Sequence, residues 1–355
     1  MLRRIFFVGA MLAVLLAAGP VPAQLDQTPI NTPKLPPESP PKSPANFDST
    51  HVLVQQAGHW ANFQNDINHW GSRNVTSANE LELALLDFAR YDGAMMAPGW
   101  MATNALIAIQ TKEFVAGIRQ WETWYGRELL LQNLHRNPAY ALFFPGSNAA
   151  QEAVLHAADR DARRLKLIGN LFKQQAYSMQ KQSWANKKHT GKTSRLAAIQ
   201  IAPATPKELR FETLAALAAP GMNQLLEPYD PQTVKINFLS ALRFGPRSAW
   251  AQTNDGLPVP SIAAHRELTI VHTLGLAALL VLDEDQNHPN FTAWMTDTQL
   301  DECVDWSRVH LNQCVAAGHF VFESSFCIAE HQLMDAGRCI ADLAAPSRPP
   351  TQLVH

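Results

Sequence analysis

The chain has 355 residues, of which 46% are hydrophobic, and a formal net charge of -2. This length suffices for one large domain or two ordinary ones, and the apolar content excludes a chain that is disordered throughout. The nearly balanced total charge excludes a protein that binds polyanions with its whole surface.

The N-terminus has the three-part pattern of a secretory signal. Two arginines precede an uncharged apolar run over residues 5–18, and small residues follow up to Ala23. The run is shorter than the roughly 20 residues of a membrane-spanning helix, which favours a signal over a membrane anchor. We therefore expect residues 1–23 to be a signal peptide that is cleaved after Ala23. The mature protein is then periplasmic or secreted and has no transmembrane helix.

The mature chain divides into regions by composition. Residues 24–46 contain seven prolines, which predicts an extended tether. Residues 47–219 have helical periodicity, and residues 220–260 are rich in proline, glycine and asparagine and predict an irregular connection. Residues 261–345 are again helical, and residues 346–355 form a flexible tail.

Helix signals recur through both helical regions, whereas alternating strand patterns are scarce. A capping box at Ser77 precedes one helix, and single helices are predicted over 112–134 and from Ser147 to about Asn186. A second capping box at Thr205 predicts a helix that runs from there to about Ala218. With further helices over 261–282, 298–316 and 320–344, the fold class is all-α, a multi-helix bundle that ends in a helical hairpin.

Four cysteines lie in that hairpin, at Cys303, Cys314, Cys327 and Cys339. Each helix carries two of them about three turns apart, and the four are nested almost symmetrically about a turn at Gly318. A bond within one helix would have to span about 16 Å, and crossed pairs would require parallel helices. The spacing therefore favours Cys303–Cys339 and Cys314–Cys327, in an oxidising compartment. The alternatives are four reduced, buried thiols or a zinc site. The pattern is similar to twin-cysteine helical hairpins, which implies a structural role.

Charge is unevenly distributed along the chain. Residues 160–195 carry ten basic side chains and one acidic one, and residues 283–343 carry eleven acidic and two basic ones. These segments could be two solvated helix faces, or they could attract each other across the fold. A third interpretation is that the basic stripe binds an anionic surface such as lipid, cell-wall polymer or DNA. The candidate residues for that surface are Arg160, Arg163, Arg164, Lys166, Lys173 and Lys181.

Motifs of common enzyme classes are absent from the sequence, including G-x-S-x-G, H-E-x-x-H and C-x-x-C. The segment Glu323-Ser324-Ser325-Phe326 resembles the E-S-x-F of lytic transglycosylases, in which the glutamate is the general acid; the alternative is a glutamate on a helix surface. His265 and His272 share a helix face but lie about 10 Å apart, an awkward spacing for one metal ion, which favours core or partly exposed histidines over a metal site. The sequence thus predicts no catalytic residue, no metal site and no cofactor.

A short N-terminal segment resembles a known family. Phe47-Asp48-Ser49-Thr50-His51 precedes a helical stretch that is rich in glutamine and asparagine (Gln55, Gln56, Asn62, Gln64, Asn65, Asn68). This pattern resembles the mature start of minor-pilin subunits of conjugative type IV secretion systems, which are exported, mostly helical and act in adhesion or assembly without catalysis. Ser49 stands where that family commonly has proline. Capping of a helix start is the other explanation for the same residues.

The function that we expect is therefore non-catalytic: an exported subunit of the envelope or of a secretion or conjugation apparatus, bound to other envelope proteins. The alternative is a periplasmic enzyme that acts on the cell wall or on a small molecule through an unrecognised helical active site. An enzyme should contain a deep pocket with converging titratable groups. An assembly subunit should instead present an exposed apolar or charged patch.

Overall fold

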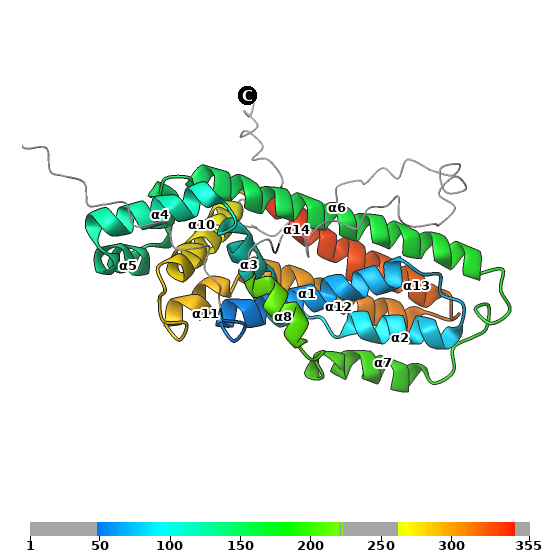
Figure 1. Cartoon of the computed structure of the whole chain (residues 1–355). Helices are drawn as coiled ribbons and strands as arrows, with labels where there is room; N and C mark the ends of the chain where they lie inside the picture. The colour runs from blue at the N-terminus through cyan, green and yellow to red at the C-terminus, as the bar shows by residue number, and fades with distance from the viewer. Residues whose placement is uncertain (1–47, 220–221, 223–261, 345–355) are drawn as a thin grey trace, which may run out of the picture. The chain divides into compact units, whose positions relative to one another are not determined.

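The computed structural model describes residues 48–219, 222 and 262–344. The predicted signal peptide (1–23), tether (24–46) and tail (346–355) lie outside the described residues, as does nearly all of the predicted connection over 220–260. Within the described ranges the secondary structure is helical, apart from one isolated antiparallel bridge between Lys188 and Phe320. The all-α class is confirmed (Figure 1). None of the described helices combines the length and apolar character that a membrane crossing would need.

The helices before the connection differ widely in length. They are α1 (Val52–Gly71), α2 (Ala78–Ala89), α3 (Gly93–Ala108), α4 (Lys112–Tyr125), α5 (Arg127–Arg136), the 3-10 segment η1 (Pro138–Phe143), α6 (Ser147–Met179), α7 (Lys192–Ile201), the 3-10 turn η2 (Ala202–Ala204) and α8 (Phe211–Ala218). With 33 residues, α6 is long enough to run past most of the other helices (Figure 1).

The helices after the connection are α10 (Ile262–Val281), α11 (Pro289–Met295), α12 (Thr298–Ala317), α13 (Glu323–Cys327), the π-helical segment η4 (Ile328–Asp335) and α14 (Ala336–Ala344). The last three follow one another without a break, so they form one rod over residues 323–344. The sequence predicts a rod over nearly the same residues, but it does not predict the π-helical segment within it.

Two predicted helices differ from those in the structure: one is divided at a glycine, and the other ends earlier than expected. The single helix predicted over 112–134 is divided at Gly126, whose φ of 82° lies in the left-handed region that glycine adopts freely. The long helix predicted to about Asn186 ends at Met179. It ends early because the chain beyond it bonds to the hairpin turn: the carbonyls of Ala185 and Lys187 accept from the N–H groups of Phe322 and Val321 at 3.1 and 3.0 Å.

The helix start predicted at Thr205 is wrong, since α8 begins only at Phe211. Lys207 lies in the segment between and reaches two carboxylates, Asp66 at 2.6 Å and Asp87 at 2.9 Å. The side-chain amide of Asn62 donates to the carbonyls of Lys207 and Glu208, at 3.4 and 3.2 Å. These long-range bonds compete with the local helical ones and hold the segment extended.

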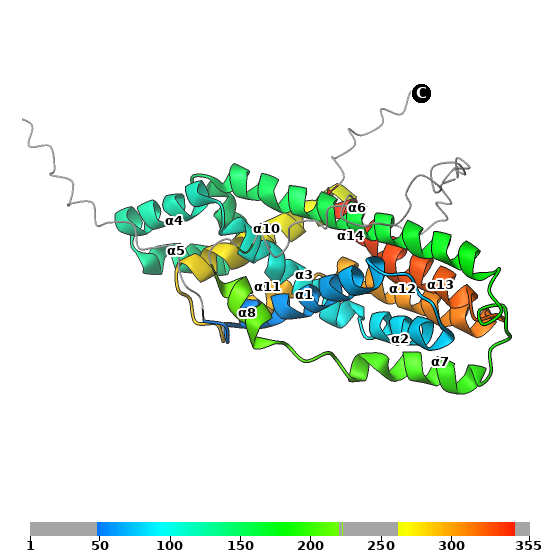
Figure 2. The same cartoon turned by 45° about the vertical axis from the view of Figure 1, so that its right-hand side comes forward.

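Two hydrophobic clusters form the core. The first joins the beginning of α1 and the end of α3 with α4, α5, α8, α10 and α11. The second joins the end of α1 and the start of α3 with α2, α7, α12, η4 and α14. Helix α6 contributes to both clusters, as do α1 and α3. Helix α3 is buried on nearly all sides, because it packs against α1, α6, α10 and α12 (Figure 2).

The C-terminal hairpin is stapled as the nested spacing favours. Cys303 is bonded to Cys339 and Cys314 to Cys327, with Cα atoms 5.8 and 5.6 Å apart. These bonds join α12 to the antiparallel α13–α14 rod, and they use all four thiols, which leaves none for the alternative zinc site. Two disulfides are consistent with an oxidising location outside the cytoplasm.

Candidate interaction surface

Aromatic side chains gather where α4 meets η1. The ring of Trp121 lies 5.6 Å from that of Tyr125 and 6.1 Å from that of Tyr140. Trp124 lies 6.4 Å from Tyr125, and Phe143 lies 6.2 Å from Tyr140. We call these five residues the α4–η1 aromatic surface. Edge-to-face and tilted contacts of this kind stabilise the arrangement of the rings, although no other part of the described chain needs to cover them.

Three members of this surface are mainly open to solvent. Phe143 is 67% exposed, Trp124 60% and Tyr125 53%. Leu129 of α5 and Leu142 of η1 are also exposed. Large apolar side chains that are scattered singly over a surface need no explanation, whereas a contiguous group of them marks an interaction site in many proteins.

Local sequence features fix the position of this surface. Gly126 turns the chain between α4 and α5. A Cβ atom on Gly117 would lie 2.2 Å from the carbonyl oxygen of Pro145, so only glycine lets the end of η1 approach α4 this closely. Phe144 then anchors η1 in the core, where it packs 5.3 Å from Trp121 and 6.4 Å from Phe114. The exposed rings therefore stand on a rigid base.

Charged residues that are close in sequence to these aromatic residues pair with one another and with the chain just after α10. Arg119, two residues before Trp121 on α4, pairs with Glu122 at 2.8 Å and with Asp283 at 3.6 Å. Arg127 at the start of α5 donates to the carbonyl of Asp283.

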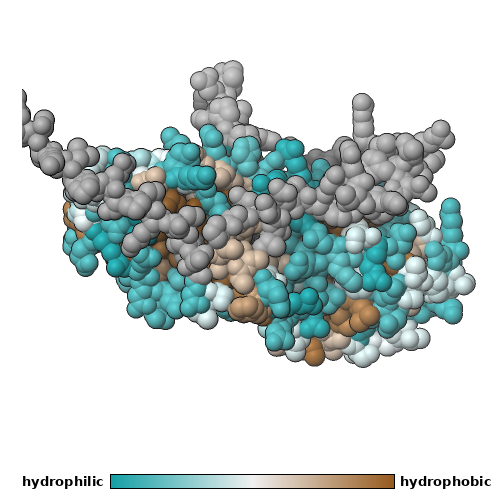
Figure 3. All heavy atoms as spheres, viewed as in Figure 1, coloured by the Kyte–Doolittle hydropathy of each residue, from teal (hydrophilic) through white to brown (hydrophobic). Residues whose placement is uncertain are grey.

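A second hydrophobic patch lies elsewhere. Most of the face in Figure 3 is hydrophilic, and a hydrophobic patch near its lower edge lies where Figure 1 places α7. Ile201, the last residue of α7, is 68% exposed, and Phe211 at the start of α8 is 70% exposed. This patch lacks the ring-to-ring contacts of the α4–η1 aromatic surface.

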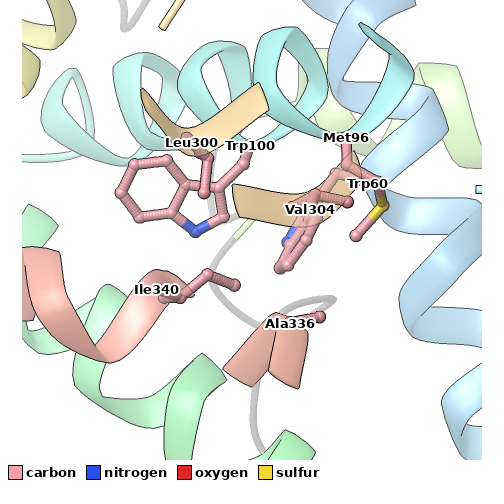
Figure 4. Close-up of a pocket in the computed structure, with 7 residues that line it drawn as sticks. All are labelled: Trp60, Met96, Trp100, Leu300, Val304, Ala336 and Ile340. Carbon is pink, nitrogen blue, oxygen red and sulfur yellow. The ribbon is translucent and has the colours of Figure 1, made fainter. Parts of the chain in front are cut away.

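A hollow between α1, α3, α12 and the end of the rod is a poor candidate for an active site. Its lining residues are Trp60, Met96, Trp100, Leu300, Val304, Ala336 and Ile340 (Figure 4). None of these side chains is titratable, and the hollow is too narrow to admit a water molecule. It is a packing gap beneath two indole rings and offers no chemistry.

The basic residues singled out on α6, and Lys181 just beyond its end, have different surroundings. Lys166 and Lys181 are exposed. Arg163 pairs with Asp159 at 2.8 Å on its own helix, and Lys173 pairs with Glu330 of η4. Arg164 donates to the side chain of Asn68 on α1. Anionic-surface binding by this stripe stays a prediction, and the Lys173–Glu330 pair is an instance of the attraction between the two charged segments.

Arg160 and Arg164 also face the carboxyl group between them. Burial raises the pKa of Asp161 to about 7, and the guanidinium groups of Arg164 and Arg160 oppose that rise. These two arginines therefore partly offset the burial of a carboxyl group on their own helix.

Glu323 has a structural role here. Its carboxylate accepts hydrogen bonds from the backbone N–H groups of His319 and Phe320, the second at 3.0 Å. It thereby closes the turn of the stapled hairpin, which the resemblance to lytic transglycosylases did not anticipate. The next residue, Ser324, is 2% exposed and accepts from Arg195, so it is not placed as a nucleophile.

The two histidines on α10 are also accounted for by packing. His265 Nε2 lies 2.7 Å from Asp297 Oδ1, and Thr269 donates to the other oxygen of Asp297 at 2.6 Å. Asp297 in turn caps α12 by accepting from Leu300 N at 2.9 Å. His272 stacks on Trp294, with ring centroids 6.2 Å apart. Both histidines thus contact side chains of the neighbouring segment 289–297.

Of the residues that carry the minor-pilin resemblance, Phe47 lies outside the described residues, and 48–51 directly precede α1. Asp48 accepts from Thr50 N at 2.9 Å, His51 accepts from Leu53 N at 3.2 Å, and Gln55 donates to the carbonyl of Ser49 at 2.7 Å. These bonds cap the helix. Comparison with family models, curated proteins and solved structures finds no match. The family resemblance therefore rests on this short segment alone.

Proposed function

We propose that the protein is a non-catalytic assembly subunit that acts outside the cytoplasm by binding another envelope protein through the α4–η1 aromatic surface. The observation that carries this proposal is the exposure of Trp124, Tyr125 and Phe143 on one rigid base. Tryptophan and tyrosine are enriched among the residues that dominate binding energy at interfaces. Association would bury rings that water now surrounds.

The export and the apparatus belong to the same proposal. The signal-like N-terminus, the two disulfides and the absence of any active-site pocket around Trp60 and Trp100 support an envelope subunit over a periplasmic enzyme. The capped start of α1 is compatible with the minor-pilin resemblance, and membership of a secretion or conjugation apparatus is the specific form of the proposal.

Site-specific photo-cross-linking in the protein's own cells tests the partner. A photoreactive amino acid is placed at Trp124 or at Phe143, and the matched control is Tyr177 on α6, which is 59% exposed. We expect a discrete adduct with an exported protein from the first two positions and none from Tyr177.

Three outcomes would contradict the proposal. The first is the absence of an adduct at positions 124 and 143. The second is an equally strong adduct from position 177, which would indicate general stickiness. The third is an adduct that contains only two copies of this chain, because it would replace the partner by self-association.

A further inference from the structure

We propose that the stapled hairpin binds one divalent transition-metal ion through His310, His331 and Asp335. His310 comes from α12, whereas His331 and Asp335 come from η4. The donor atoms of the three side chains lie within 4.8 Å of one another. The site would link α12 to the α13–α14 rod, which the two disulfides already link at two other positions.

The distances suit a single ion. Asp335 Oδ2 lies 2.8 Å from His331 Nδ1 and 3.6 Å from His310 Nδ1. Two atoms bound to one zinc ion at about 2.0–2.1 Å in tetrahedral geometry lie about 3.4 Å apart. The three donors thus need to move only slightly to share an ion, and His310, whose side chain is 47% exposed, is free to turn.

The surroundings of the carboxylate favour its role as a ligand. Arg338 donates to Asp335 Oδ1, which leaves Oδ2 toward the histidines. A second partner that orients a metal-binding carboxylate is a common feature of such sites.

The backbone at the site is also unusual. His331 and Asp335 both lie within the π-helical segment, and π-helical insertions in α-helices occur frequently at functional sites. Cys314–Cys327 lies on one side of η4 in sequence and Cys303–Cys339 on the other, so the disulfides hold α12 against the rod on both sides. The donors are therefore preorganised across two elements.

The donor set indicates which class of metal ion binds. Two imidazoles and one carboxylate suit zinc, nickel, copper or ferrous iron better than calcium or magnesium, which prefer oxygen ligands throughout. Three protein donors on a half-exposed surface leave a coordination position for water. The sequence gives little indication of this site, because His310 lies on a different helix from the other two donors.

Zinc titration of the oxidised full-length protein tests the proposal. After treatment with a chelator, calorimetry should show saturable binding of one zinc ion per chain. His310→Ala should weaken this binding by about ten-fold or more, because it removes a ligand. The matched control His156→Ala, which removes an exposed histidine from α6, should bind zinc as the parent does.

A second measurement separates coordination from loss of folding. Cobalt(II) should give a visible absorption band that saturates at one equivalent in the parent protein and in His156→Ala. The band should be absent in His310→Ala and in Asp335→Asn, while far-ultraviolet circular dichroism stays unchanged. Zinc binding that does not saturate at one equivalent, or that is equal in His310→Ala and the parent, would overturn the proposal.

Discussion

The two disulfides should stabilise the protein by different amounts, because they close loops of different length. Cys303 and Cys339 are 36 residues apart, and Cys314 and Cys327 are 13 apart. In the chain-entropy relation, the outer bond alone contributes about 3.8 kcal/mol to the free energy of unfolding and the inner bond alone about 2.9 kcal/mol. The bonds are nested, however, so each closes part of the other's loop.

Nesting changes the cost of removing one bond while the other remains. With the inner bond in place, the outer one closes an additional loop of about 24 residues, which is worth about 3.4 kcal/mol. By the thermodynamic cycle, loss of the inner bond alone then costs about 2.5 kcal/mol. We therefore expect Cys303→Ala/Cys339→Ala to be less stable than Cys314→Ala/Cys327→Ala by about 1 kcal/mol.

Equilibrium urea unfolding followed by circular dichroism measures this difference. The comparison is matched, since each double variant removes one buried cysteine (Cys339 or Cys327) and one half-buried cysteine. In a strong reductant the parent and both variants should converge, because no loop remains closed. The reasoning is refuted if loss of the inner bond costs as much as loss of the outer one, or if the difference persists in reductant.

Two further predictions concern buried polar contacts. Burial and the charge of Arg195 lower the pKa of His189 to about 4, so the folded protein binds fewer protons than the unfolded chain between about pH 6.5 and 4. The free energy of unfolding should therefore fall by about 1 kcal/mol as the pH is lowered from 7 to 5; this figure already allows for the partial exposure of His189. In His189→Gln, which has no imidazole to titrate, the urea midpoint should change much less over the same pH range. Lys207→Met should cost about 2–3 kcal/mol, because it leaves the Asp66 carboxylate buried without its cation. Lys166→Met, at an exposed position, should change stability by less than about 0.5 kcal/mol, and an equal loss in both would contradict the role of the ion pair.

Local patterns in the sequence predict most of the helices and the stapled hairpin. Ser77 accepts from Glu80 N at 3.2 Å, as the capping box requires, and the cysteine spacing gives the register of α12 against the rod. Such features depend on residues that are close in sequence or on a single short turn. The prediction at Thr205 is wrong for the opposite reason, since Lys207 bonds to Asp66, a residue on a distant helix.

The sequence predicts less of the aromatic surface and of the proposed metal site. The α4–η1 aromatic surface requires η1 to fold back on α4, which depends on the contact between Gly117 and Pro145. The run of aromatic residues just before Gly126 is the one local signal of it. Likewise, His310 lies close to Asp335 because the two arms of the hairpin pair and because Asp335 lies in a π-helical segment. Neither feature can be recognised from the order of polar and apolar residues in the two helices.

The sharing of α1, α3 and α6 between the two hydrophobic clusters has a consequence for how the described helices unfold. If one cluster opened alone, these helices would expose some of their apolar residues while the others stayed packed. Each cluster therefore makes the other more costly to open, and the bundle should melt as one cooperative unit. A destabilising substitution at either end of α6 should then lower the melting temperature of the whole bundle, and no partly folded species should accumulate.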